Sequence, residues 1–301
     1  MIYYVNLDKF YKIVTAMKIL QDLNVDLHTH STASDGSITP SQLVNRAIEN
    51  GVDILALTDH DTVNGIPEGL ETASGTDLTF IPGVEVSTMW GGSCIHVLGL
   101  DVQLNNVELK KALSLIQKGR FERAERINLA LIKAGLPSIL EHALSIAGSK
   151  GQIGRVHFAR AMIQKNLCED IRDVFSRYLV KGKPGFVAHE WPSLKTVINL
   201  ILKANGLPVI AHPARYKLPN NWLTYLLEEF ASLGGIGIEV ATGSHSLADI
   251  ERFKKISIEY DFKASRGSDF HSPSESRYDV GRAPYLPDCL LPIWASIGLR
   301  G

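Results

Sequence analysis

Short apolar runs rich in β-branched residues alternate with helical stretches from residue 24 onward. The first four runs, which we expect to be strands, are residues 25–27, 53–58, 78–86 and 95–100. The helix expected after the first run is well marked: Thr39 is its N-cap, Pro40 opens it, Gln42 completes a capping box and Gly51 follows its end. Strands and helices in alternation predict an α/β core.

This alternation stops between about residues 105 and 190, where the pattern is helical throughout. Strand patterns resume at residues 207–213, 234–241 and 262–271. A strand-containing core interrupted in this way predicts an inserted helical subdomain. The expected divisions are an N-terminal extension (1–23), a first barrel part (24–104), the helical insertion (105–190) and a second barrel part (191–301).

The composition is that of a folded protein with balanced charge. The 301-residue chain carries 31 Lys and Arg against 32 Asp and Glu, a net charge of −1, and 45% of its residues are hydrophobic. A disordered chain would be poorer in apolar residues, and a duplex DNA binder would carry a broad basic surface. No apolar run reaches the roughly 18 residues of a membrane helix, and charged residues interrupt the N-terminal segment. We therefore expect a cytoplasmic protein that binds neither membranes nor duplex DNA.

Six of the ten histidines and three carboxylates lie beside the expected strands. In a parallel α/β barrel the carboxyl ends of the strands form one mouth, so residues far apart in sequence meet there. His28 and His30 form an HxH pair, whose imidazoles point the same way from an extended segment. Mixed nitrogen and oxygen donors suit Zn, Mn or Fe, and imidazole argues against Mg or Ca as the only ions. The nine candidate metal ligands are His28, His30, Asp35, His60, Glu85, His96, His212, Asp269 and His271.

These residues lie in the motifs DLHTHS, SDG, ALTDHD, GVEVS, IAHP and GSDFH and in the expected strand that contains His96. Together they resemble the PHP (polymerase and histidinol phosphatase) superfamily over nearly the whole chain from residue 24. Within it, LTDHDTVNG, the GRVHFAR segment, KGKPGFV, HEWPSL and GSDFHSPSE resemble the nucleoside 3′,5′-bisphosphate phosphatases, also described as ribonuclease AM. The resemblance implies an α/β fold, a distorted TIM-like (β/α)7 barrel, with three divalent ions per chain. Manganese is the expected ion, with zinc and iron as alternatives.

Carried over residue by residue, the family pattern divides the ligands among three ions and makes Glu85 a bridge between two of them. The first ion would take His28, His30, Glu85 and Asp269, the second Glu85, His96 and His212, and the third Asp35, His60 and His271.

The acidic neighbours of the ligands are expected to support them. Glu85, His212 and Asp269 are the expected catalytic residues. Asp26 precedes His28 by two residues and is expected to orient an imidazole rather than to bind an ion. Asp59 and Asp61 flank His60, and we expect structural roles for both.

Basic residues of the insertion are expected to hold a second phosphate. Arg155 and His157 lie on one helical segment and are the better candidates, whereas Arg160 either joins them or solvates the helix face. Lys183 in the KGKPG loop is preferred over Lys181, although a loop rich in Lys and Gly is often simply exposed.

These features predict a metal-dependent phosphoesterase, in which paired ions activate water for in-line attack on phosphorus. The expected reaction is removal of the 3′-phosphate from nucleoside 3′,5′-bisphosphates such as pAp, 5′-3′ exoribonuclease action on short 5′-phosphorylated RNA, or both. No GxSxG motif supports a serine nucleophile. The alternatives are a histidinol phosphate phosphatase, a proofreading nuclease like the related barrels of bacterial replicases, and a degenerate barrel that serves as a binding module.

Overall fold

The computed structural model describes residues 18–298, so most of the expected N-terminal extension (residues 1–17) lies outside the described residues. The strands of this part of the chain are β1 (Val25–Asp26), β2 (Ile54–Leu57), β3 (Thr79–Trp90), β4 (Ser93–Leu100), β5 (Leu207–Ile210), β6 (Gly237–Thr242) and β7 (Lys263–Gly267). Its α-helices are α2 (Pro40–Glu49), α3 (Ile66–Ala73), α4 (Val107–Lys133), α5 (Leu140–Ala147), α6 (Arg155–Gln164), α7 (Ile171–Val174), α8 (Leu194–Lys203), α9 (Asn220–Ser232) and α10 (Leu247–Glu259). Shorter helical turns are η1 (Phe175–Leu179), η2 (Pro213–Tyr216) and η3 (Ile293–Ser296).

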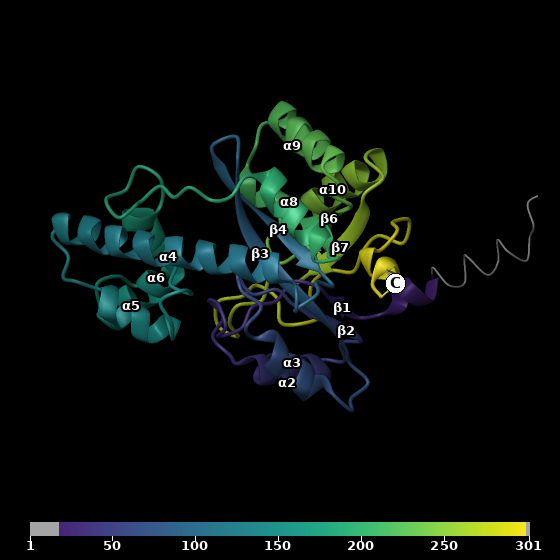
Figure 1. Cartoon of the computed structure of the whole chain (residues 1–301), viewed down its shortest axis with the longest axis horizontal. Coiled ribbons are helices and arrows are strands. Elements are labelled where there is room, and N and C mark those ends of the chain that lie inside the picture. The colour runs from purple at the N-terminus through teal and green to yellow at the C-terminus, as the bar shows by residue number, and fades with distance from the viewer. Residues whose placement is uncertain (1–17, 299–301) are drawn as a thin grey trace, which may run out of the picture.

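Within residues 18–298 the strands form one seven-stranded sheet in the order β1 to β7, and its edges meet (Figure 1). The Leu27 amide donates to the Arg266 carbonyl at 3.0 Å and the Asp269 amide donates to the His28 carbonyl at 2.8 Å. A Cβ on Gly267 would lie 2.3 Å from the Cβ of His28, so glycine is needed where β7 approaches this ligand. The expected seven-stranded α/β barrel is confirmed.

One sequence expectation about this barrel is wrong: its strands are not all parallel. β4 runs antiparallel to both β3 and β5, while the remaining neighbours pair in parallel. The cause is the connection between β3 and β4, which consists of Gly91 and Gly92 with φ of 55° and 75°. Two residues with positive φ make a tight hairpin turn, and a hairpin forces its strands to be antiparallel. His96 therefore reaches the barrel mouth from the first half of β4 rather than from a strand end.

The capping box expected for α2 is confirmed. The Thr39 hydroxyl accepts from the Gln42 amide at 3.2 Å, and the Gln42 side chain accepts from the Thr39 amide at 2.9 Å. Pro40 opens the helix and Gly51 follows it with φ of 67°. These contacts satisfy backbone N–H groups that the first helical turn leaves unpaired.

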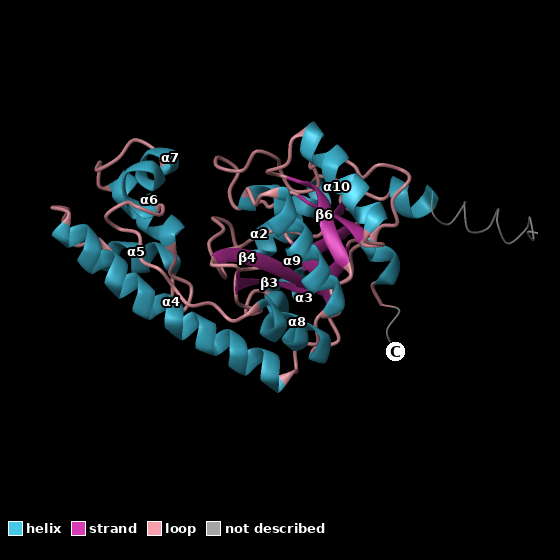
Figure 2. Cartoon of the chain, turned by 90° about the horizontal axis from the view of Figure 1, so that it is seen from above, coloured by secondary structure: helices cyan, strands magenta, loops and turns pink. Residues whose placement is uncertain are grey.

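The helices α4 to α7 have a hydrophobic core of their own. Leu109, Leu113 and Ile116 in the first half of α4 pack into the barrel core. Ile127 and Leu131 in its second half pack into a separate cluster with residues of α5 and α6. Figure 2 shows α5, α6 and α7 set apart from the strands, with α4 running from the barrel to them. Helix α4 thus belongs to both cores and holds the helical part against the barrel.

Among the described residues, no helix combines the length and the apolar character needed to cross a bilayer.

Candidate metal centre and substrate cavity

The structure brings all nine candidate metal ligands together at one mouth of the barrel. Within the described residues they form overlapping groups whose donor atoms lie within 4.8 Å of one another. These groups are His30, Asp35, His60 and His271; His28, Glu85 and His212; His28, His30 and Asp269; and His60, Glu85 and His96. Residues from β3, β4, the loops after β1 and β2, and the segments after β5 and β7 therefore share one small volume.

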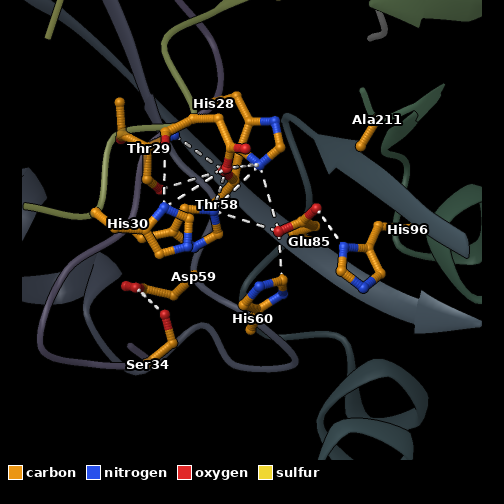
Figure 3. A network of polar contacts seen from close by, with 12 residues as sticks. His28, Thr29, His30, Ser34, Thr58, Asp59, His60, Glu85, His96 and Ala211 are labelled. Atoms are coloured by element: carbon orange, nitrogen blue, oxygen red, sulfur yellow. Dashed lines mark hydrogen bonds and ion pairs between the residues drawn. The ribbon is translucent and has the colours of Figure 1, made fainter. Parts of the chain in front are cut away.

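Glu85 lies at the centre of this cluster, between imidazoles from different strands (Figure 3). Its Oε1 is 2.8 Å from His96 Nδ1 and 2.9 Å from His212 Nε2. Its Oε2 is 3.0 Å from His60 Nδ1 and 3.3 Å from the Nε2 atoms of both His28 and His30. Burial by itself would raise the pKa of Glu85, but the surrounding imidazoles outweigh it and hold that pKa well below its usual range. Glu85 is therefore a carboxylate anion at neutral pH.

Several buried polar atoms of the cluster have no hydrogen-bond partner. An unpaired buried donor or acceptor costs about 1–3 kcal/mol, so such a concentration within one site calls for a ligand. Imidazole nitrogens and carboxylate oxygens are the donors that divalent transition metals prefer. The residues present therefore fit bound metal ions. Among the described residues the cluster atoms without a well-aligned hydrogen bond are His30 Nδ1, His60 Nδ1, Glu85 Oε2, His212 Nδ1 and Asp269 Oδ1, although Glu85 Oε2 and His60 Nδ1 lie in ion-pair contact.

Two of the imidazoles are held neutral by their surroundings. Burial and the neighbouring Arg215 lower the pKa of His212 to about 3. Burial and the neighbouring His30 lower the pKa of His271 to about 4. A neutral imidazole is the form that binds a metal ion, so both side chains are ready to act as ligands.

Glu239 in β6 orients two of the ligands, which the sequence analysis did not foresee. Its Oε1 accepts from His28 Nδ1 at 2.9 Å, and its Oε2 accepts from the His212 backbone amide at 2.5 Å. Asp26 does not contact an imidazole, as was expected, but holds backbone around the ligands. It accepts from the backbone amides of Ser268 and Gly281, at 2.8 and 2.7 Å, and from that of His28 at 3.4 Å. The sequence feature that could have identified Glu239 is that it is the single carboxylate in the otherwise apolar run GIGIEVA. A charge buried in such a strand needs a partner.

Asp59 and Asp61 hold backbone and loops around His60, consistent with the structural roles expected for them. Asp59 accepts from the Ser31 amide at 2.7 Å and from the Ser34 hydroxyl at 2.6 Å. Asp61 accepts from the Ser87 amide at 2.8 Å and from Arg120 Nε at 2.7 Å. Since Arg120 lies on α4, this last contact ties the helical part to the metal cluster.

A cavity of about 510 Å³, which we call cavity 1, opens from the metal cluster toward the helical part. The ligands His60 and His96 line this cavity, and so do Arg123, Arg155 and Lys181. Burial and repulsion from neighbouring arginines lower the pKa of Arg123 to about 10 and also lower that of Arg155. Half-buried arginines without carboxylate partners among the described residues mark an anion site. The aromatic side chains of Phe175, Phe186 and Trp191 also line this cavity.

The residues predicted to bind substrate are placed differently from one another. Arg155 lines cavity 1 and donates to the Leu179 carbonyl at 3.2 Å. His157 is buried, and its Nδ1 accepts from the Gly154 amide at 3.0 Å. His157 therefore caps α6 rather than facing the cavity.

Arg160 donates to the Glu275 carboxylate at 3.1 and 2.6 Å and to the Asp35 carbonyl at 2.8 Å. These bonds join α6 to the segments around two ligands. Lys183 is exposed and does not line cavity 1, whereas Lys181 does.

Sequence reasoning missed Arg123 and Arg215. Arg215 donates to Asp269 Oδ2 at 2.8 Å and lines cavity 1. The sequence feature that could have identified Arg215 is its position three residues after the ligand His212, in the IAHPAR segment. Arg123 lies on α4 among several other Lys and Arg residues, and nothing in the sequence separates it from them.

Comparison with known proteins gives consistent results. A family model described as PHP domain matches residues 26–187. A 3′,5′-nucleoside bisphosphate phosphatase of Chromobacterium violaceum is 40% identical over 277 residues, which cover 92% of this chain and 97% of that protein. The 5′-3′ exoribonuclease Rnm of Escherichia coli is 38% identical over 271 residues, covering 89% and 92% of the two chains.

Solved structures agree with these relatives. An amidohydrolase from Chromobacterium violaceum, with bound sulfate and no metal, superposes with a TM-score of 0.89 at 40% identity, covering 92% of this chain and 96% of that one. A protein from Bifidobacterium adolescentis assigned as a metal-dependent phosphoesterase superposes with a TM-score of 0.78 at 25% identity, covering 89% and 93%.

Proposed function

The chain belongs to the PHP domain family, and from this premise we propose that it is a metal-dependent phosphoesterase acting on nucleotides with a 5′-phosphate. Its substrates are nucleoside 3′,5′-bisphosphates such as pAp and short 5′-phosphorylated RNA, in line with the names of its relatives. The observation that carries the proposal is that cavity 1 joins the cluster around Glu85 to Arg123 and Arg155, which have no carboxylate partner among the described residues.

We propose that three divalent ions, with manganese as the natural choice, occupy the cluster as the family pattern assigns them. His28, His30 and Asp269 of the first ion lie together, and Glu85 groups with His96 on one side and with His212 on the other. Asp35, His60 and His271 belong to a further group. When bound, such ions lower the pKa of water and neutralise the oxygens of the scissile phosphate. Glu85 is an anion in contact with imidazoles of both neighbouring groups, which supports its role as the bridge.

The arginine end of cavity 1 holds the phosphate that is not cleaved. Arg123, Arg155 and Lys181 present positive charge there, and a guanidinium binds a terminal phosphate with two parallel hydrogen bonds. Phe175 and Phe186 provide apolar surface for the nucleoside. With the 5′-phosphate at this end, the 3′-phosphate reaches the metal cluster.

The reaction is hydrolysis of the bond between phosphorus and O3′. Water supplies a hydroxyl group to phosphorus, and O3′ leaves with a proton. pAp gives AMP and inorganic phosphate, and RNA gives a nucleoside 5′-monophosphate and a shortened RNA that carries a new 5′-phosphate. Arg215, beside Asp269, is placed to neutralise an oxygen of the scissile phosphate.

Steady-state kinetics on three substrates tests this function. The protein reconstituted with Mn²⁺ should hydrolyse pAp and 5′-phosphorylated RNA, and chelation should abolish both activities. Histidinol phosphate has a single phosphate and leaves the arginine end of cavity 1 empty, so it should be a poor substrate. A preference for histidinol phosphate, or full activity in a metal-stripped sample, would refute the proposal.

A further inference from the structure

A second cavity, of about 720 Å³, adjoins the metal cluster at Asp269 and His271, and we call it cavity 2. Arg215 and His271 line both cavities. The candidate ligands therefore lie where the two cavities meet. Each volume falls in the range of roughly 300–1,000 Å³ that holds a drug-sized ligand, which is the size of a mononucleotide.

No part of a bound nucleoside bisphosphate would occupy cavity 2. Its 5′-phosphate and nucleoside occupy cavity 1, and it ends at the 3′-phosphate in the metal cluster. In RNA the same phosphate continues to a second nucleotide, which must leave the cluster by another opening. We propose that cavity 2 binds the RNA segment on the 3′ side of the scissile phosphate, an inference that rests on the exoribonuclease part of the proposed function.

Two of the three carboxylates that line cavity 2 are paired with arginines, which reduces their repulsion of a polyanion. Asp269 accepts from Arg215 at 2.8 Å, and Glu275 accepts from Arg160. Asp170 caps α7 by accepting from the Asp173 amide at 2.7 Å. Arginines therefore neutralise two of the three lining acids, and Asp170 alone keeps its full charge.

Two arginines of cavity 2, in contrast, keep most of their donors free. Within residues 18–298, no hydrogen bond or ion pair involves the exposed side chain of Arg172. Arg277 is also exposed, and its guanidinium donates one bond of 3.3 Å, to the His245 carbonyl. Arg172 lies in α7 and Arg277 lies in the segment after β7. An RNA strand bound in cavity 2 would therefore contact both the helical part and the barrel.

Small polar residues complete the lining. Gly243, Ser244 and Ser274 face the same cavity, and serine hydroxyls donate to phosphate oxygens and accept from ribose 2′-hydroxyls. Among the described residues that line cavity 2 there is no Phe, Tyr or Trp, whereas Phe175, Phe186 and Trp191 line cavity 1. Cavity 2 is therefore suited to hold a sugar–phosphate backbone of any sequence rather than to stack a particular base.

The test compares pAp with 5′-phosphorylated RNA of two, three and five nucleotides, using the Mn²⁺-loaded enzyme. In the double variant Arg172→Ala/Arg277→Ala, kcat/KM for the RNA trimer and pentamer should fall about tenfold or more, while that for pAp should stay at the wild-type value. The slope of log(kcat/KM) against log[salt] for RNA should become shallower by about 0.7 for each lost phosphate contact. Fluorescence anisotropy with RNA whose first linkage is a hydrolysis-resistant phosphorothioate should show the same loss in binding.

Two further variants serve as controls. Arg282→Ala removes an exposed arginine that does not line cavity 2 and should behave as wild type. Arg277→Lys keeps the charge and should recover part of the RNA activity. An equal loss on pAp and RNA, or no selective loss on RNA, would overturn the role of cavity 2. A wild-type enzyme that hydrolyses pAp but not RNA would overturn it too while leaving the phosphatase activity standing, whereas inactivity on both substrates would refute the proposed function itself.

Discussion

The carboxylate of Glu239 accepts from the imidazole of His28 through one oxygen and from the backbone amide of His212 through the other, at 2.9 and 2.5 Å. His212 has φ of 29°, a value that a residue with a side chain adopts only when its surroundings hold it there. Glu239 thus fixes the tautomer of one ligand and the backbone of another. His28 must carry its proton on Nδ1, which leaves Nε2 free to bind an ion.

Glu239→Gln should weaken metal binding without unfolding the protein. Both carboxylate oxygens of Glu239 accept hydrogen bonds, whereas a glutamine side chain has a single acceptor oxygen. Either His28 or the His212 amide therefore loses its partner in the variant. Partners of this kind typically change metal affinity by about 10–100-fold. Competition with a calibrated chelator measures the affinity directly. Glu229→Gln is the matched control, because Glu229 accepts from the Trp90 indole at the surface. The metal affinity of this variant should equal that of the wild-type protein. Equal affinities for all three proteins would contradict the role of Glu239.

Glu85→Gln should reduce the number of bound ions per chain. The neutral amide removes the negative charge between the neighbouring groups, so cations bound close together would repel each other. Activity on pAp should be lost for the same reason. Elemental analysis counts the ions, and a thermal melt with circular dichroism shows whether the fold persists. An unchanged ion count in a folded variant would place the bridge on another residue.

The ligand set was predictable from sequence because its members follow a geometric rule. Alternate residues of an extended segment point the same way, and parallel strands bring their carboxyl ends together, so His28, His30 and Asp269 were expected to meet. The same rule misplaced His96, which lies in the first half of an antiparallel strand. The turn residues Gly91 and Gly92 were the local signal for that reversal.

The substrate end of the site was less predictable, since helix faces carry weaker information than strand ends. Arg155 and Arg160 are five residues apart on α6, yet one lines cavity 1 and the other is held by Glu275. The difference depends on where Glu275 lies in the folded chain, 115 residues away from Arg160. Arg123 was overlooked for a similar reason, because only the packing of α4 against the barrel decides which of its charges face the cavity.

His245 should make the stability of the protein depend on pH. Its Nδ1 donates to the Val240 carbonyl at 2.8 Å, its Nε2 accepts from the Ala214 amide at 3.3 Å, and its ring stacks on Phe253. Burial lowers its pKa below the usual value of 6.5, so the folded protein favours the neutral ring. The unfolded chain then binds more protons just below pH 6.5. The stability that His245 contributes is therefore complete above pH 6.5 and is lost as the pH falls through the lowered pKa.

His245→Gln tests this dependence. At pH 8 the variant should be less stable by about 1–3 kcal/mol, and the difference should shrink toward pH 5, where the wild type must bury a charged ring or release it. Urea unfolding at both pH values measures the two free energies, with chelator present throughout so that metal loss does not enter. A difference that stays constant from pH 8 to pH 5 would show that His245 does not titrate on unfolding.

Arg155→Ala should separate binding of the second phosphate from catalysis. Arg155 lines cavity 1 but belongs to none of the candidate metal-binding groups, so its loss should leave the metal content unchanged. A charge-assisted hydrogen bond contributes about 1.5–3 kcal/mol, so kcat/KM for pAp should fall by about ten- to a hundredfold, while that for adenosine 3′-monophosphate should barely change. Lys181→Ala should act in the same direction with a smaller effect, because an ammonium is a point charge that cannot make the two parallel hydrogen bonds of a guanidinium.

Lys183→Ala is the matched control for Lys181→Ala. Lys183 lies two residues from Lys181 but does not line cavity 1, so this variant should match wild type on both substrates. If Arg155→Ala lowered both substrates equally, Arg155 would support the fold through its bond to the Leu179 carbonyl and would not bind the 5′-phosphate. RNA with a 5′-hydroxyl extends the test, because wild-type enzyme should prefer 5′-phosphorylated RNA and Arg155→Ala should erase that preference.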